Sequence, residues 1–133
     1  LRTEVGLLQG CQIGIMPLPD SEWARGKCGL KLLQYMALGI PAIASPIGVN
    51  RKIITSGENG LLATTPSEWC CHLLRLCRDE GLRRRLGETA RRTVEEQYAL
   101  KVWGPRLAKE YLAMADHTGP LAVGRALRQS LNR

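Results

Sequence analysis

A glycine-rich stretch leading into a helical pattern carries the residues best suited to chemistry in this chain of 133 residues. Gly26 and Gly29 flank Lys27 and Cys28, and a helical pattern of apolar residues follows from Leu30. Glycines let a backbone approach a ligand closely, the free N–H groups of a helix start favour an anion, and a lysine adds a point charge. The stretch therefore predicts a site for a phosphate-like group, although glycine before a helix is common and the signal is weak alone.

Two lysines and a glutamine extend this signal along the expected helix. Lys27, Lys31 and Gln34 are spaced i, i+4 and i+7, which predicts one polar stripe on a mostly apolar helix. The stripe either faces a charged ligand or is simply the solvent side, and the spacing favours neither reading.

The cysteines offer a second kind of chemistry. Cys28 lies near the expected helix start and beside Lys27, a setting that favours a reactive thiolate, so a thiol enzyme is one alternative. The only histidines, His72 and His117, are distant in sequence, which disfavours it.

Cys70, Cys71, His72 and Cys77 crowd one segment and resemble a set of metal ligands. Adjacent residues of one helix point about 100° apart, which is poor geometry for a tetrahedral site. We therefore expect no metal and interpret these cysteines as buried apolar residues. The odd count of five cysteines, without a C-x-x-C pair, likewise argues against a disulfide scaffold.

The formal net charge of +7 arises mainly from two regions, residues 75–92 and the acid-free segment 117–133. Within the first region, arginine and glutamate alternate four residues apart, as on a solvated helix face with ion pairs. The expected pairs are Arg84–Glu88, Glu88–Arg92, Arg91–Glu95 and Arg92–Glu96. This pattern argues against nucleic acid as a partner, whereas peripheral contact with an anionic membrane stays open.

Short apolar runs alternate with helical patterns along the chain, which predicts an α/β fold with a Rossmann-like, doubly wound parallel sheet. The expected strands are 12–16, 41–44 and 61–63. The first expected helices are 4–9, 30–38 and 51–56. In the second of them Leu30, Leu33 and Ala37 share one face, and Leu32 and Met36 lie beside it. The Thr65–Glu68 capping box opens the next helix, with Trp69, Leu73 and Leu76 inward, and two further helices have apolar stripes over 82–94 and 103–114.

Three strands make a thin sheet, so we expect an N-terminally truncated domain over residues 1–116, followed by a basic tail over 117–133. Ligands of open parallel sheets bind beyond the carboxyl ends of the strands. That rule places the site on the loops 17–29, 45–50 and 64–66.

The stretch from Gly26 to Ser45 resembles the donor-binding motif of group one (family four) glycosyltransferases of the GT-B fold. The similarity continues upstream over 13–18 and downstream over 48–50 and 57–62. Such enzymes have two Rossmann-like domains that face each other across a cleft, and the C-terminal one binds a nucleotide sugar.

The resemblance implies that this chain is the partial C-terminal domain, with a nucleoside-diphosphate sugar as substrate. The acceptor would be held by a missing N-terminal domain, and no cofactor or metal would be needed. The implied donor-binding residues are Gly26, Lys27, Cys28, Gly29, Leu30, Lys31 and Gln34. No catalytic nucleophile is predicted from this half.

This chain departs from the family's pattern at three positions. The motif usually carries two glutamates, one for the donor sugar and one for the ribose, where this chain has Gly26 and Gln34. An amide can still donate to and accept from ribose hydroxyls, whereas glycine has no side chain to contact the sugar. Lys52 stands where relatives often have an acid.

The resemblance thus implies a retaining glycosyltransferase of bacterial cell-surface polysaccharide, lipopolysaccharide or glycolipid synthesis, located in the cytoplasm or at the inner face of the membrane. This fragment alone would be inactive. The alternative is a catalytically degenerate module that only binds a nucleotide sugar. The sugar, the base and the acceptor stay open.

Overall fold

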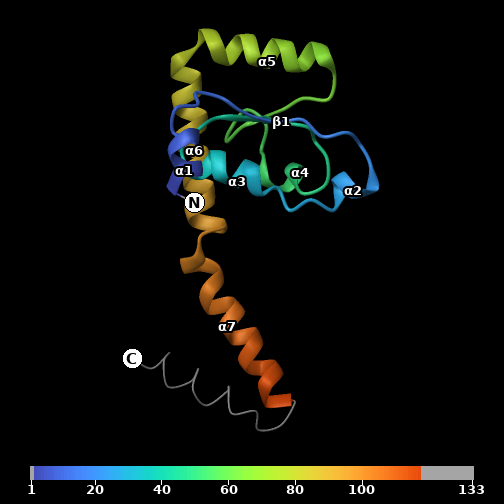
Figure 1. Cartoon of the computed structure of the whole chain (residues 1–133), viewed down its shortest axis with the longest axis vertical. Coiled ribbons are helices and arrows are strands. Elements are labelled where there is room, and N and C mark those ends of the chain that lie inside the picture. Colours follow the sequence, from blue (N-terminus) through green and yellow to red (C-terminus); the bar gives the residue numbers. More distant parts are fainter. Residues whose placement is uncertain (1, 118–133) are drawn as a thin grey trace. The chain divides into compact units, whose positions relative to one another are not determined.

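The computed structural model describes residues 2–117 (Figure 1). The chain divides after Glu96 into two units, and each is described by itself. The first unit contains a parallel sheet with the strand order β1 (Gly14–Met16), β2 (Ala42–Ala44) and β3 (Leu61–Leu62). The α/β fold and all three predicted strands are confirmed, each strand being one or two residues shorter than expected.

Helices surround this sheet on both faces. In chain order the helices that begin in the first unit are α1 (Arg2–Leu8), α2 (Glu22–Arg25), α3 (Leu30–Ala37), α4 (Asn50–Ile53), α5 (Pro66–Arg78) and α6 (Glu80–Gln97), and the second unit contains α7 (Leu100–His117). Helix α3 packs against β1 and β2, and α5 packs against β2. Figure 1 shows α3 and α5 on opposite sides of the sheet, the arrangement expected of a doubly wound fold.

The central strand β2 is buried along its whole length, because helices cover both of its faces. Its Ile43 belongs to a cluster with Leu61, Ala63, Leu76, Leu82 and Leu86, against which Ile13, Trp69 and Leu73 pack. The predicted inward face of α5 is thereby confirmed. On the other side of the sheet Gly14 lies directly under Tyr35 of α3, since a Cβ at Gly14 would lie 2.5 Å from two ring carbons.

The predicted capping box at the start of α5 is formed. Thr65 Oγ1 accepts a hydrogen bond from Glu68 N, and Glu68 Oε2 accepts from Thr65 N and Thr64 N at 2.9 and 2.7 Å. These amide hydrogen bonds, the one from Thr65 first, hold the pKa of Glu68 below its ordinary value of 4.5. The box fixes the loop that leaves the carboxyl end of β3.

Two local predictions were wrong. The polar loop after β1 contains a one-turn helix, α2, whose N-cap Ser21 accepts a hydrogen bond from Ala24 N. The buried face of α3 carries Leu32 and Met36, whereas Leu30 is 59% exposed. Leu32 and Met36 face the sheet together with Tyr35, so the opposite side of α3, which carries Leu30, points outward.

Helix α7 makes up most of the second unit's described part. The large apolar residues of its predicted stripe are each at least half exposed: Trp103, Leu107, Tyr111 and Met114. The helix begins at Leu100 and continues through Pro105. No helix within residues 2–117 combines the length and the apolar character needed to cross a bilayer.

The predicted domain limit at residue 116 stays a prediction. Of the predicted basic tail, only His117 lies within the described residues; positions 118–133 lie outside them.

Candidate functional site

The three strands end at the same edge of the sheet, and the loops that follow them form the candidate site. Because β1, β2 and β3 pair in parallel, their carboxyl ends bring together loops 17–29, 45–49 and 63–65. The seven predicted donor-binding residues all lie in the first of these loops and in the first turns of α3. The structure therefore brings them together at the edge where such sheets bind ligands.

Gly29 sets the start of α3. Its φ of 73° is left-handed, a conformation that L side chains rarely adopt, and its role is N-cap without any side-chain hydrogen bond. A Cβ at this position would lie 2.8 Å from Ile53 Cδ1 and 3.1 Å from Val49 Cγ1. The glycine thus allows α3 to begin in close contact with α4.

This start leaves the first turn of α3 open to a ligand. No side chain caps it, and no acidic residue lies within it. The first amides of a helix lack partners inside the helix, and their dipoles favour negative charge. Leu30 and Lys31 are both exposed at this end of the helix.

The predicted stripe of Lys27, Lys31 and Gln34 is only partly correct. Because α3 begins at Leu30, Lys27 precedes the helix, and its Nζ lies 3.9 Å from the centre of the Trp23 ring. Lys31 is exposed and Gln34 half-buried on α3, on the same outward face as Leu30. A single exposed leucine is ordinary on a protein surface, so this face does not decide between a stripe that binds a ligand and one that faces solvent.

Gly26 and Cys28 complete the predicted set. Gly26 ends α2 with φ of −78°, and a Cβ there would meet only the backbone oxygens of Trp23 at 3.6 Å and Glu22 at 3.8 Å. The backbone would therefore accept a side chain where the family usually has glutamate. Cys28 is an exposed free thiol.

Asn50 is a residue of this site to which the sequence assigned no role. It is 1% exposed, and its Nδ2 donates to Ser45 O at 3.0 Å, while its Oδ1 is buried without a partner among the described residues. That oxygen lies 3.5 Å from the position of a Cβ on Gly29. Asn50 therefore holds the loop after β2 beside the start of α3.

A network around Ser45 stiffens the same loop. Ser45 Oγ accepts a hydrogen bond from Leu18 N at 2.9 Å, which joins the loops after β1 and β2.

Arg25 of α2 forms an ion pair with Asp20, with 2.7 Å between Nε and Oδ1. The hydrogen bond from Arg25 lowers the pKa of Asp20, and the same bond raises the pKa of the guanidinium. No pattern in the sequence indicates this pair.

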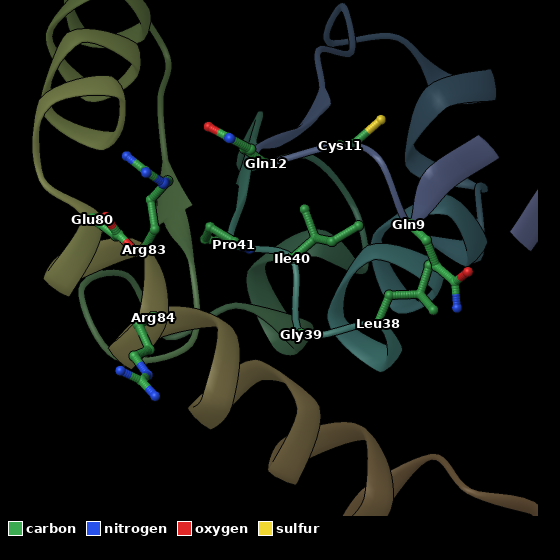
Figure 2. A pocket seen from close by; sticks show the side chains of 10 residues that line it. All are labelled: Gln9, Cys11, Gln12, Leu38, Gly39, Ile40, Pro41, Glu80, Arg83 and Arg84. Carbon is green, nitrogen blue, oxygen red and sulfur yellow. The ribbon is translucent and has the colours of Figure 1, made fainter. Parts of the chain in front are cut away.

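A hollow of about 540 Å³ lies at the opposite edge of the sheet, next to the residues that precede β1 and β2 (Figure 2). Its lining includes Cys11, Gln12, Pro41 and Arg84. Figure 2 shows the side chains of Cys11 and Arg84 pointing away from each other, so they do not converge on one ligand. Despite its volume, this hollow is therefore a weaker candidate for the ligand site than the loops at the carboxyl edge of the sheet.

The cysteines and the histidine of segment 70–77 do not form a metal site. Within residues 2–117 no three histidine, cysteine or acidic side chains are close enough to hold a metal. His72 Nε2 donates to Leu62 O at 3.2 Å, and Cys70, Cys71 and Cys77 are exposed. The expectation of buried cysteines was wrong, because Trp69, Leu73 and Leu76 occupy the inward face of α5.

The arginine-rich α6 carries ion pairs as predicted. Two of the four expected pairs are formed, Arg84–Glu88 at 3.4 Å and Arg91–Glu95 at 2.9 Å. Exposed pairs of this kind are worth little to stability, but they offset part of the positive charge of the helix.

Comparison with known proteins agrees with this geometry. The fold resembles the crystal structure of the C-terminal domain of a glycosyl transferase group 1 family protein (LpcC) from Francisella tularensis, with a TM-score of 0.60 and 24% identity over 71% of this chain and 47% of that one. This likeness establishes the fold as that of a glycosyltransferase C-terminal domain.

The family follows from the sequence itself. Residues 4–79, more than half of the chain, match the family model described as glycosyl transferases group 1, and the chain belongs to that family. It is also 36% identical over 72 residues to N-acetyl-alpha-D-glucosaminyl L-malate synthase of Bacillus anthracis. That match spans 53% of this chain and 19% of the relative.

Proposed function

We propose that this chain is the donor-binding half of a glycosyltransferase that takes a nucleoside-diphosphate sugar and retains the anomeric configuration. The uncapped first turn of α3, at the carboxyl edge of the sheet, is the observation that carries the proposal. The amides of Leu30 and Lys31 would hold the diphosphate, and the charges of Lys31 and Lys27 would offset the negative charge that builds up on it as the sugar leaves.

Gln34 would bind the ribose. It lies one turn further along α3 than Lys31 and is half-buried. Its amide can donate to one hydroxyl and accept from another, which a carboxylate cannot do. The acceptor would be bound by a separate N-terminal domain, and neither a cofactor nor a metal would take part.

A bacterial pathway of cell-surface polysaccharide, lipopolysaccharide or glycolipid synthesis, in the cytoplasm or at the inner membrane face, fits this assignment. Family membership supports sugar transfer, whereas the name of the Bacillus relative describes a glucosaminyl group on L-malate and does not itself point to a polysaccharide or lipid acceptor.

Isothermal titration calorimetry of the full chain with UDP, GDP, ADP and CDP tests the proposal. One of them should bind, and Gln34→Ala should weaken its affinity about three- to tenfold through the lost hydrogen bonds. Gln12→Ala, at the opposite edge of the sheet, is the matched control and should bind as the wild type does. Equal affinity of the Gln34 variant and the control would contradict the assignment.

A second candidate, a module that binds a nucleotide sugar without turnover, is favoured by Gly26. The backbone there would accept a side chain, so packing does not explain the missing carboxylate. A transfer assay on the full-length protein separates the two candidates. Sugar transfer by the wild type would exclude the degenerate module. Transfer only after Gly26→Glu would favour it.

A further inference from the structure

A second hollow, of about 350 Å³, lies at the carboxyl edge of the sheet, between α2 and the loop after β2. It is lined by Asp20, Arg25, Pro46, Ile47, Gly48 and Arg51. Pockets for small molecules range from about 300 to 1,000 Å³, so this one has room for a single compact group. None of its lining residues belongs to the predicted donor-binding set.

The charges in this pocket do not balance. Two guanidinium groups face one carboxylate, so the lining as a whole keeps one positive charge. Asp20 binds Arg25 through a 2.7 Å contact, with both side chains more than half exposed. Both arginines stabilise the ionised form of Asp20, which lowers its pKa, the hydrogen bond from Arg25 being the largest cause. Arg51 Nε donates to Pro46 O, which holds that side chain against the loop.

The backbone holds the two segments that carry the arginines close together. Gly48 has φ of 53°, and a Cβ there would lie 2.5 Å from Arg25 O, so only glycine lets the loop approach α2 this closely. Asn50 anchors the same loop through Ser45 O. The two guanidinium groups therefore project from elements that are held together.

We propose that this pocket binds the phosphoryl group of a second ligand, and that Asp20 occupies Arg25 as an internal counter-ion until that ligand arrives. Guanidinium groups bind phosphate oxygens in pairs, so a phosphoryl group can replace the carboxylate at Arg25 and add Arg51. This pocket is separate from the proposed donor site, because no predicted donor-binding residue lines it. Lys27, which lies nearest in sequence to Arg25 among the charged donor-binding residues, contacts Trp23 instead.

Arginine side-chain NMR on the full chain tests this directly. Inorganic phosphate is titrated at constant ionic strength while the Nε–Hε signals of Arg25 and Arg51 are followed. Both signals should shift along one saturation curve, and Arg51→Gln should weaken binding at least about fivefold. Lys27→Ala should leave the affinity within twofold, whereas a loss there would show that the pocket is only part of the donor site and overturn the proposal.

Asp20→Asn is the decisive variant, because it removes the competing carboxylate. Phosphate should then bind about two- to fivefold more tightly, the range expected for releasing an exposed ion pair. The matched control is Glu95→Gln, which frees Arg91 from a pair of similar length and exposure. Absence of saturable shifts, no tightening in Asp20→Asn, or equal tightening at Arg91 in the control would each overturn the proposal.

Two further arms identify the source of the phosphoryl group. Glucose 6-phosphate represents soluble phosphate esters, and phosphatidylcholine vesicles containing phosphatidic acid represent lipid headgroups. Tightening by Asp20→Asn in either arm supports the pocket and names the source. If the variant tightens neither ligand, the pocket takes free phosphate but no phosphoryl group of a larger ligand, and the proposal is overturned.

Discussion

Alanine at Gly29 should disturb the start of α3 more than alanine at any unhindered glycine. The left-handed backbone at φ of 73° costs an alanine about 1–2 kcal/mol. The new methyl group would also lie 2.8 Å from Ile53 Cδ1 and 3.1 Å from Val49 Cγ1. Overpacking of this kind adds about 1–3 kcal/mol. The free energy of unfolding should therefore fall by about 2–5 kcal/mol in total.

Two other glycines separate these contributions. Gly57 has φ of 91° with nothing within 4 Å of a Cβ, so Gly57→Ala should carry the backbone cost alone, about 1–2 kcal/mol. Gly26 has φ of −78° and no close atom, so Gly26→Ala should be neutral or stabilising by up to about 1 kcal/mol.

Urea denaturation of the three variants measures the differences, and calorimetry with the bound nucleoside diphosphate measures the consequence for the site. Gly29→Ala should weaken that affinity, because the methyl group pushes the first amides of α3 away from α4. Equal destabilisation by Gly29→Ala and Gly57→Ala would refute the close contact between α3 and α4.

Three further outcomes follow from the structure. Asn59 is buried and bonded to Thr55 N, Ile53 O and Thr93 Oγ1, so Asn59→Ala should lower the free energy of unfolding by about 2–4 kcal/mol in urea denaturation. Glu68 has a folded-state pKa below its ordinary 4.5, so its contribution to the free energy of unfolding is complete above pH 4.5 and is lost as the pH falls through the lowered pKa. In acid denaturation below pH 4.5, Glu68→Gln should therefore lose less stability than the wild type does. Cys28→Ser should bind the nucleoside diphosphate as the wild type does in calorimetry, whereas loss of binding would revive a role for the thiol.

The features that could be predicted from sequence are those with local causes. The strands are apolar runs bounded by proline or glycine, and the capping box needs only Thr65 and Glu68 with their own backbone. The meeting of the three following loops at one edge could be predicted in turn, because parallel strands place their carboxyl ends together.

The features that were missed depend on what packs where. An apolar pattern on α3 contains Leu30 as well as Leu32, and only the position of the sheet decides which of them is buried. In α5 the cysteines lie outside because three larger side chains already fill the inward face. The Arg25–Asp20 pair and the buried Asn50 arise where separate loops meet, and no spacing in one segment indicates such a meeting.

Backbone NMR shows whether the first turn of α3 binds the diphosphate of the donor. The amide signals of Leu30 and Lys31 are followed during titration with the nucleoside diphosphate that binds and, separately, with its nucleoside. Both amide signals should show large, saturable shifts with the diphosphate and small ones with the nucleoside. Saturable diphosphate binding that leaves both amides unshifted would contradict binding at this turn.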